Sequence, residues 1–203
     1  RISILVGGAV GGISTLLGLA IGLVSGYYRK VDAVIMRFMD GLMAFPSLIL
    51  ALALIAVLGA SVQNVIIVIT TVSVPLVARV VRASVLSLRE QQFIDAAKAL
   101  GVPDWRILML HIAPNTLAVL MVQGTFVFAL AVIAEANLSF LGAGVPPTTP
   151  SWGNIMGQGR TYLPLAFWVT FFPGVFLSLT VLAINLLGDG LRDALDPKLR
   201  RRA

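Results

Sequence analysis

The stretch DAAKALGVPDWRILMLHIAPN, which runs from Asp95 to Asn115, decides the fold of this chain. It carries four charged residues, one histidine and two prolines. It lies between long stretches without charged residues, in a chain whose hydrophobic fraction is 58%. A connection of about five residues would suffice between two neighbouring helices. The longer, charged segment therefore indicates a built element rather than a simple connection.

This segment is predicted to form a helix, a glycine corner and a second helix. Residues 92–100 favour a helix, and Gly101 is placed to end it in the left-handed conformation. Pro103 suits the first position of a second short helix, and Asp104 then lies near its positive end. Pro114 marks the start of the next helix in the same way. The apolar strip of the first helix is predicted to comprise Phe93, Ala96, Ala97 and Leu100.

The composition of the chain is that of a membrane protein. Its 203 residues have a mean hydropathy of +0.96. Only 12% of them are charged, whereas charged residues make up about a quarter of a soluble domain. The chain is therefore predicted to be an all-α protein in a lipid bilayer, because helices satisfy every backbone polar group within the segment.

The charges locate the membrane spans, since one charge at the bilayer centre costs about 2.5 to 3.5 kcal/mol. A span needs about 20 apolar residues. The longest charge-free gap, 41–78, is broken by the turn cluster GASVQN at 59–64. Prolines and glycines prevent a continuous helix in 136–159. The chain is therefore read as one domain, 1–203, with spans near 2–26, 42–58, 64–82, 112–135 and 166–188, an inner loop at 87–111 and an external loop at 136–165.

The distribution of Lys and Arg predicts the orientation. Thirteen of the fifteen cations fall in segments 27–41, 79–111 and the C-terminal tail, and only Arg1 and Arg160 lie on the other side. These three segments are therefore expected in the cytoplasm, with the C-terminus. The chain begins without Met, so a further piece is expected upstream of Arg1.

Several function classes are excluded by residues that the sequence lacks. Without cysteine there is no disulfide or thiolate metal site, and the single histidine, His111, cannot build a common zinc centre. There is no G-x-S-x-G elbow and no Gly-Lys pair, so no hydrolase or phosphate-loop signature. No basic face interleaved with aromatics indicates nucleic-acid binding. The chain is therefore not predicted to be an enzyme, and any ATP that it uses must be bound outside this chain.

The opening segment resembles the cytoplasmic EAA signature of bacterial ABC-importer permeases. Asp95 stands where Glu is usual, and Leu108 where Ile is commoner. Residues 25–59, 135–156 and 185–197 are also similar to the C-type permease subunit of dipeptide, oligopeptide and nickel importers. The signature falls on Asp95, Ala96, Ala97, Gly101, Leu108, His111, Ile112, Pro114 and Asn115.

The resemblance implies a type I importer permease in the bacterial inner membrane, working by alternating access. It also implies that the expected upstream piece holds a further N-terminal span. Its expected partners are a homologous permease, two cytoplasmic ATPases that hold ATP and Mg, and an extracytoplasmic solute-binding protein. Residues 92–106 would be the coupling helix. Di- or oligopeptides are the expected solutes, with nickel, glutathione or opine-like solutes open. The residues assigned to ATPase coupling are Asp95, Ala96, Ala97, Gly101, Pro103, His111 and Pro114.

Two residues are candidates for a translocation path or gate. Pro75 should kink or interrupt its helix, although packing alone explains many kinks. Glu135 is an ionisable group near the outer end of a span, where it either lines the path, pairs with another subunit or is wetted at the interface. An ion-coupled secondary transporter that uses Glu135 and the Pro75 kink is the alternative function. That reading leaves the charged inner loop without a role.

Small residues recur at four-residue spacing in the first predicted span. This spacing keeps them on one stripe, where a second helix can approach closely. The partner is either another helix of the same bundle or a neighbouring subunit. One run is Ser14, Gly18, Gly22 and Gly26, and a second is Gly7 and Gly11.

Overall fold

The computed structural model describes residues 1–195, and these are helical, without a strand. The predicted cytoplasmic residues Asp196, Lys198, Arg200, Arg201 and Arg202 lie outside the described part. In chain order the elements are α1 (Ile2–Tyr27), α2 (Arg29–Met43), α3 (Ser47–Leu58), α4 (Val62–Arg89), α5 (Gln92–Ala99), α6 (Asp104–Arg106), the π-helix η1 (Ile107–Ile112), α7 (Ala113–Phe140), α8 (Trp152–Gly159), the 3-10 turn η2 (Arg160–Tyr162) and α9 (Trp168–Leu195).

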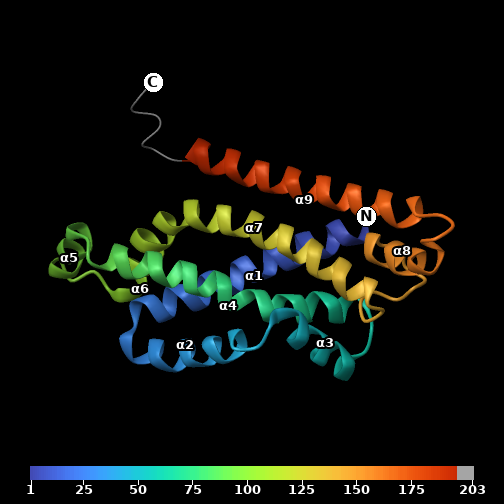
Figure 1. Ribbon diagram of the computed structural model, residues 1–203. Coiled ribbons are helices and arrows are strands. Elements are labelled where there is room, and N and C mark those ends of the chain that lie inside the picture. The colour runs from blue at the N-terminus through green and yellow to red at the C-terminus, as the bar shows by residue number, and fades with distance from the viewer. Residues whose placement is uncertain (196–203) are drawn as a thin grey trace.

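Four segments are long and apolar enough to cross a membrane: α1, α4, the continuous run from α6 to α7, and α9. The pair α2 and α3 passes the same test together and is bent by 89°, as in a broken span or a re-entrant loop. Figure 1 shows the long helices side by side, with α5 beyond one end of the bundle and α8 beside the N-terminus at the other. The predicted all-α membrane fold is therefore confirmed, with four single spans plus one bent pair.

Helix α1 lies at the centre of the bundle and packs against both α4 and α7. A Cβ atom added at any of three α1 glycines would lie 2.5 to 2.6 Å from a valine Cβ of α4. The two backbones therefore approach so closely that only glycine fits. The pairs along this seam are Gly18 with Val77, Gly22 with Val81 and Gly26 with Val85.

The second run of small residues faces α7. A Cβ atom added at Gly7 would lie 2.5 Å from Cγ2 of Val132, and one added at Gly11 would lie 3.1 Å from Cβ of Phe128. Both predicted stripes thus pack inside this chain. The alternative, a subunit interface at these glycines, is wrong.

Helix α4 is longer than the predicted span 64–82 and continues to Arg89. Its charged last turns leave the apolar part of the bundle without ending the helix, because charges mark the lipid boundary and not the helix end. Ser61 begins α4 by accepting a hydrogen bond from the Asn64 amide, at 3.1 Å. The helix continues past the buried Pro75 as one element, although this proline has no N–H to donate to the backbone ladder.

Pro114 lies at the start of α7, as predicted, but α7 is not separated from the helix before it. The helical run begins at Asp104 and continues through η1 into α7. A proline ring clashes with the carbonyl four residues earlier in a regular α-helix, and the wider π turn of η1 precedes Pro114 directly. The carbonyl of His111 accepts a hydrogen bond from the Asn115 side chain, at 2.6 Å, which keeps it satisfied beside the proline.

The predicted external loop 136–165 is partly helical. Helix α7 continues to Phe140. Gly142, two residues later, has a positive φ of 81° and turns the chain away from the helix. Ser151 then caps α8 by accepting a hydrogen bond from the Asn154 amide, at 3.2 Å. The irregular part is therefore confined to residues 141–151 and a short turn before α9.

Replacing Gly22 by Ala is expected to destabilise the fold. The new methyl would lie 2.6 Å from Val81 Cβ and 2.8 Å from the Ala78 carbonyl oxygen, and overpacking of this kind costs about 1 to 3 kcal/mol. Gly12 of the same helix has no atom within 4 Å of such a methyl, so Gly12→Ala is the matched control. Thermal unfolding in detergent should show a lower midpoint for Gly22→Ala alone. Equal midpoints would contradict the tight seam.

Candidate functional site

The charged end of the bundle is built around the corner at Gly101. Gly101 has a positive φ of 74°, as predicted for a residue that ends a helix. The amide of Val102 donates to the Ala97 carbonyl at 3.1 Å, and the amide of Gly101 donates to the Lys98 carbonyl at 2.9 Å. These two bonds form a Schellman motif, which holds the corner in one geometry.

The face that α5 turns toward the bundle differs from the predicted apolar strip. Ile94 and Ala97 are buried, and α5 packs with them against η1. Phe93, Ala96 and Leu100 are exposed instead. Two apolar stripes run side by side on this short helix, and periodicity alone does not tell which one meets the bundle.

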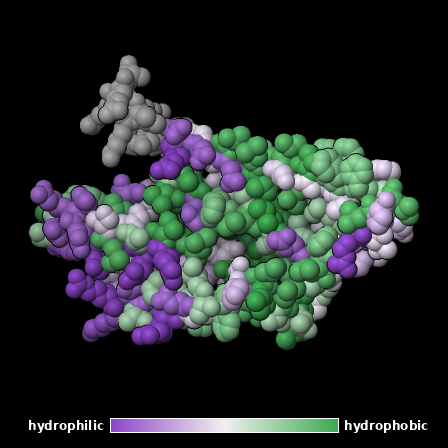
Figure 2. All heavy atoms as spheres, in the orientation of Figure 1, coloured by the Kyte–Doolittle hydropathy of each residue, from purple (hydrophilic) through white to green (hydrophobic). Residues whose placement is uncertain are grey.

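Large apolar side chains are exposed at this otherwise hydrophilic end. Leu100 is 83% exposed and Trp105 61% exposed, with Phe93 on the same side of α5 as Leu100. Figure 2 shows hydrophilic residues gathered around α5 and the start of α2, while hydrophobic residues cover most of the rest of this face. We call Phe93, Leu100 and Trp105 the apolar tip. Exposed apolar groups rimmed by polar ones are typical of a protein interaction site.

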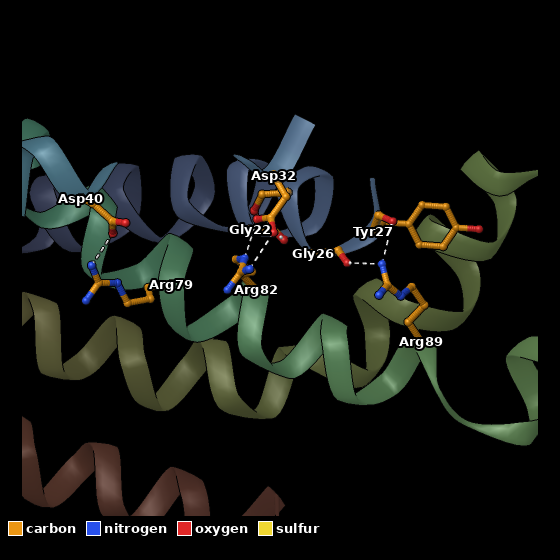
Figure 3. A network of polar contacts seen from close by, with 9 residues as sticks. Gly22, Gly26, Tyr27, Asp32, Asp40, Arg79, Arg82 and Arg89 are labelled. Carbon is orange, nitrogen blue, oxygen red and sulfur yellow. Dashed lines mark hydrogen bonds and ion pairs between the residues drawn. The ribbon is translucent and has the colours of Figure 1, made fainter. Parts of the chain in front are cut away.

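Hydrogen bonds connect the end of α1 to the segment after the corner. The Tyr27 hydroxyl donates to Oδ1 of Asp104 at 2.6 Å. The guanidinium of Arg89, at the end of α4, donates to the carbonyls of Gly26 and Tyr27 at 3.2 and 3.1 Å (Figure 3). These carbonyls belong to the last turn of α1, where no intrahelical donor remains. One polar cluster thus joins α1, α4 and α6.

Two ion pairs hold α2 against α4 (Figure 3). Arg82 binds both carboxylate oxygens of Asp32, at 2.5 and 2.6 Å, and both side chains are partly buried. Arg79 binds Asp40 at 2.6 Å, and the two side chains are 50% and 57% exposed. The bidentate, partly buried pair is the stronger of the two, because exposed ion pairs contribute about 0 to 1 kcal/mol.

The structure brings most of the predicted coupling residues together and separates two of them. Asp95, Ala96, Ala97, Gly101 and Pro103 lie within α5 and its corner. Asp95 is exposed and lies 3.8 Å from Nζ of Lys98.

His111 and Pro114 lie farther along, in η1 and the first turn of α7. Sequence reasoning missed Tyr27, Arg89 and Ile94. Tyr27 and Asp104 are 77 residues apart, so no local pattern announces their contact.

Neither candidate path residue lines the cavity beside the α2–α3 junction. This cavity of about 520 Å³ lies between that junction, α4 and α7, and Pro75 and Glu135 do not belong to its lining. Its wall is mostly apolar, with Phe45, Ser73, Leu130 and Asn137 among its residues. Glu135 is fully buried, so its predicted alternative as a wetted interfacial group is wrong. Among residues 1–195 no cluster of three or more His, Cys, Asp or Glu side chains could hold a metal ion.

Relatives of known type match nearly the whole chain. A putative peptide transport system permease protein of Brucella suis is 50% identical over 200 residues, which cover 98% of this chain and 68% of the relative. The dipeptide transport system permease protein DppC of Alkalihalophilus pseudofirmus is 47% identical and covers 91% of this chain and 61% of its own length. The glutathione transport system permease protein GsiD of Escherichia coli is 45% identical, covering 95% and 65%. The chain thus spans about two thirds of these relatives.

A solved structure shares the fold. The inward-facing MetNI methionine ABC transporter matches with a TM-score of 0.78 at 21% identity, covering 96% of this chain and 93% of the matched chain. The family described as binding-protein-dependent transport system inner membrane component matches residues 14–201. These matches confirm the resemblance and give no support to an ion-coupled transporter. The chain belongs to the family of inner membrane components of binding-protein-dependent transport systems.

Proposed function

We propose that this chain is the permease subunit of an ATP-driven importer that moves di- or oligopeptides inward by alternating access. The peptide assignment is supported by the names of relatives that are 47 to 50% identical. A relative at 45% identity is named a glutathione permease, and its solute falls in the same class because glutathione is itself a small peptide.

The rigid corner at Gly101 is the observation that carries this proposal. A short helix of eight residues is marginal by itself in water, yet α5 is fixed by the buried Ile94 and by the Schellman motif. Its apolar tip then points away from the bundle. A fixed helix with an exposed apolar tip suits a cytoplasmic partner that pushes on it, because a flexible loop would absorb the push.

The push would reach the bundle through the contacts around Tyr27. Movement of the segment 92–106 shifts Asp104, which Tyr27 holds at the end of α1. Arg89 links the same end of α1 to α4. Because α1 and α4 share the tight glycine seam, they would move as one unit.

The expected assembly follows from this arrangement. Two ATPase subunits would hold ATP and Mg and bind the coupling segments from the cytoplasm, and this chain would carry no cofactor of its own. A homologous permease would stand beside it in the inner membrane, and a solute-binding protein would dock at the end with α8. The C-terminus would lie in the cytoplasm.

Replacing Gly101 by Val tests the coupling role. A left-handed backbone costs an ordinary residue about 1 to 2 kcal/mol, and no atom lies within 4 Å of an added Cβ, so strain is the only effect. Co-purified ATPase and ATP-dependent uptake in proteoliposomes should fall by about 5- to 30-fold. Gly101→Asn should retain both, because Asn tolerates this conformation.

Gly142→Val is the matched control at the opposite end. Gly142 also has a positive φ and open space, and it closes a Schellman motif at the end of α7. This variant should leave ATPase binding unchanged. ATPase binding by Gly101→Val at the level of Gly101→Asn would overturn the coupling role of the corner.

Tyr27→Phe should weaken the link between the corner and α1. It removes one hydrogen bond worth about 1 kcal/mol, which corresponds to about fivefold. We expect uptake per ATP hydrolysed to fall by about this factor, while the ATPase subunits still co-purify. Tyr28→Phe, at the exposed neighbour, is the control and should leave the ratio unchanged. An unchanged ratio in Tyr27→Phe would show that force does not pass through this bond.

A further inference from the structure

Glu135 lies near the end of α7 that faces α8, and it is the one fully buried acidic side chain among residues 1–195. Its carboxylate oxygen Oε1 accepts a hydrogen bond from the Ser139 hydroxyl, at 2.7 Å. Its other oxygen, Oε2, is buried without a hydrogen-bond partner among the described residues. An unsatisfied buried oxygen of this kind costs about 1 to 3 kcal/mol, and more for a charged group. A carboxyl group at such a place calls for an explanation beyond packing.

Ser139 links Glu135 to the loop 141–151 through a second hydrogen bond. While its hydroxyl donates to Glu135, its oxygen accepts a hydrogen bond from the backbone amide of Val145, at 3.2 Å. The bond to Glu135 therefore orients the hydroxyl so that a lone pair faces the loop. The Val145 side chain is 3% exposed and packs in the core.

Asn154 of α8 holds the same loop from its other side. Its side-chain amide donates to the carbonyls of Val145, Pro146 and Thr149, at 3.2, 3.0 and 2.9 Å. Val145 is thus bound through its amide by Ser139 and through its carbonyl by Asn154. The loop contains three prolines and no regular structure, so these side chains supply bonds that a helix or strand would otherwise provide.

Two glycines let the loop and α8 close onto α7. A Cβ atom at Gly144 would collide with the backbone and hydroxyl of Ser139. A Cβ atom at Gly153 would collide with the Ala136 carbonyl. The outer segment is therefore seated against the α7 turn that contains Glu135 and Ser139, without space between them.

We propose that Glu135 is a positioning residue for transport: through Ser139 it holds the loop 141–151 shut on the outer end of α7, and the loop is released when the transporter opens outward. We call this set, Glu135, Ser139 and the Val145 amide, the outer latch. The proposal rests on the proposed function, since a latch at this end has a role only in a chain that opens there. Glu135 acts here by orienting a neighbour and does not touch the solute.

The chain has no cysteine, so a single introduced thiol reports on the latch without background from this subunit. Val145→Cys places that thiol at the buried loop position, with the backbone amide retained. In the assembled transporter without nucleotide, a membrane-impermeant maleimide should label it poorly. After trapping with ATP and orthovanadate, labelling should rise as the loop lifts. Thr148→Cys, at an exposed position of the same loop, should label in both states.

Glu135→Leu or Ser139→Ala, combined with Val145→Cys, should raise labelling in the nucleotide-free complex by about tenfold, the factor expected for one lost hydrogen bond to a carboxyl group. Glu135→Gln keeps an acceptor oxygen for Ser139 and should restore protection. This rescue separates an orienting role from general loosening. Normal ATPase co-purification and Thr148→Cys labelling confirm that each variant is folded and assembled.

Two results would overturn the outer latch. One is labelling in Glu135→Leu and Ser139→Ala that stays at the level of the Val145→Cys parent. The other is labelling in Glu135→Gln that equals that in Glu135→Leu. If the latch variants behave as expected while ATP and orthovanadate leave the parent protected, Glu135 holds the loop but the loop is not released, and that part of the proposal is overturned. ATP-dependent uptake by the parent, measured separately, then decides whether the proposed function fails as well.

Discussion

The close approach of α1 and α4 is the constraint on which the rest of this structure depends. Lipid tails are as apolar as valine, so helices in a bilayer associate through packing rather than through the hydrophobic effect. The seam from Gly18 to Gly26 supplies that packing. It also fixes the register of the two helices, because each glycine meets one valine. In this register Arg89 reaches the open carbonyls at the end of α1.

The two ends of the bundle use the same local solution. At each end a helix stops in a Schellman motif with an unhindered glycine, Gly101 or Gly142. Beyond each glycine, side-chain hydrogen bonds hold the segment that follows. Near the charged end the Tyr27 hydroxyl donates to the Asp104 side chain, and near the other end Ser139 and Asn154 bind the backbone of the loop. A lipid-embedded bundle thus presents a fixed segment on each side, and neither is a free loop.

The sequence predicts the elements of this fold better than their limits. The helical class, the small-residue stripe and the Gly101 corner follow from local rules, since each depends on residues within a few turns. The end of α4 at Arg89 and the unbroken run past Pro114 do not follow from charge gaps, because a helix can outlast the lipid. The burial of Ile94 rather than Phe93 depends on η1, a distant segment. Ser139 does lie four residues after Glu135, a spacing that places both on one helix face.

The position of α9 bears on how motion would spread. It packs mainly on α7 and α8, and its side chains are largely exposed. In contrast, α1 contacts α4 and α7 along its length. A push that entered at α5 and α6 would meet the α1–α4 pair first, and it would also travel directly along the continuous run from Asp104 to Phe140. That run ends one residue after Ser139, so one continuous helical run connects the Gly101 corner to the loop 141–151. The π turn at Ile107–Ile112 is the one place in this run where the regular α-helical bonding changes, and it lies next to the corner rather than in the middle of the bundle. If the proposed coupling holds, most of the run would therefore move as a rigid rod, and α9 would follow through its contacts with α7.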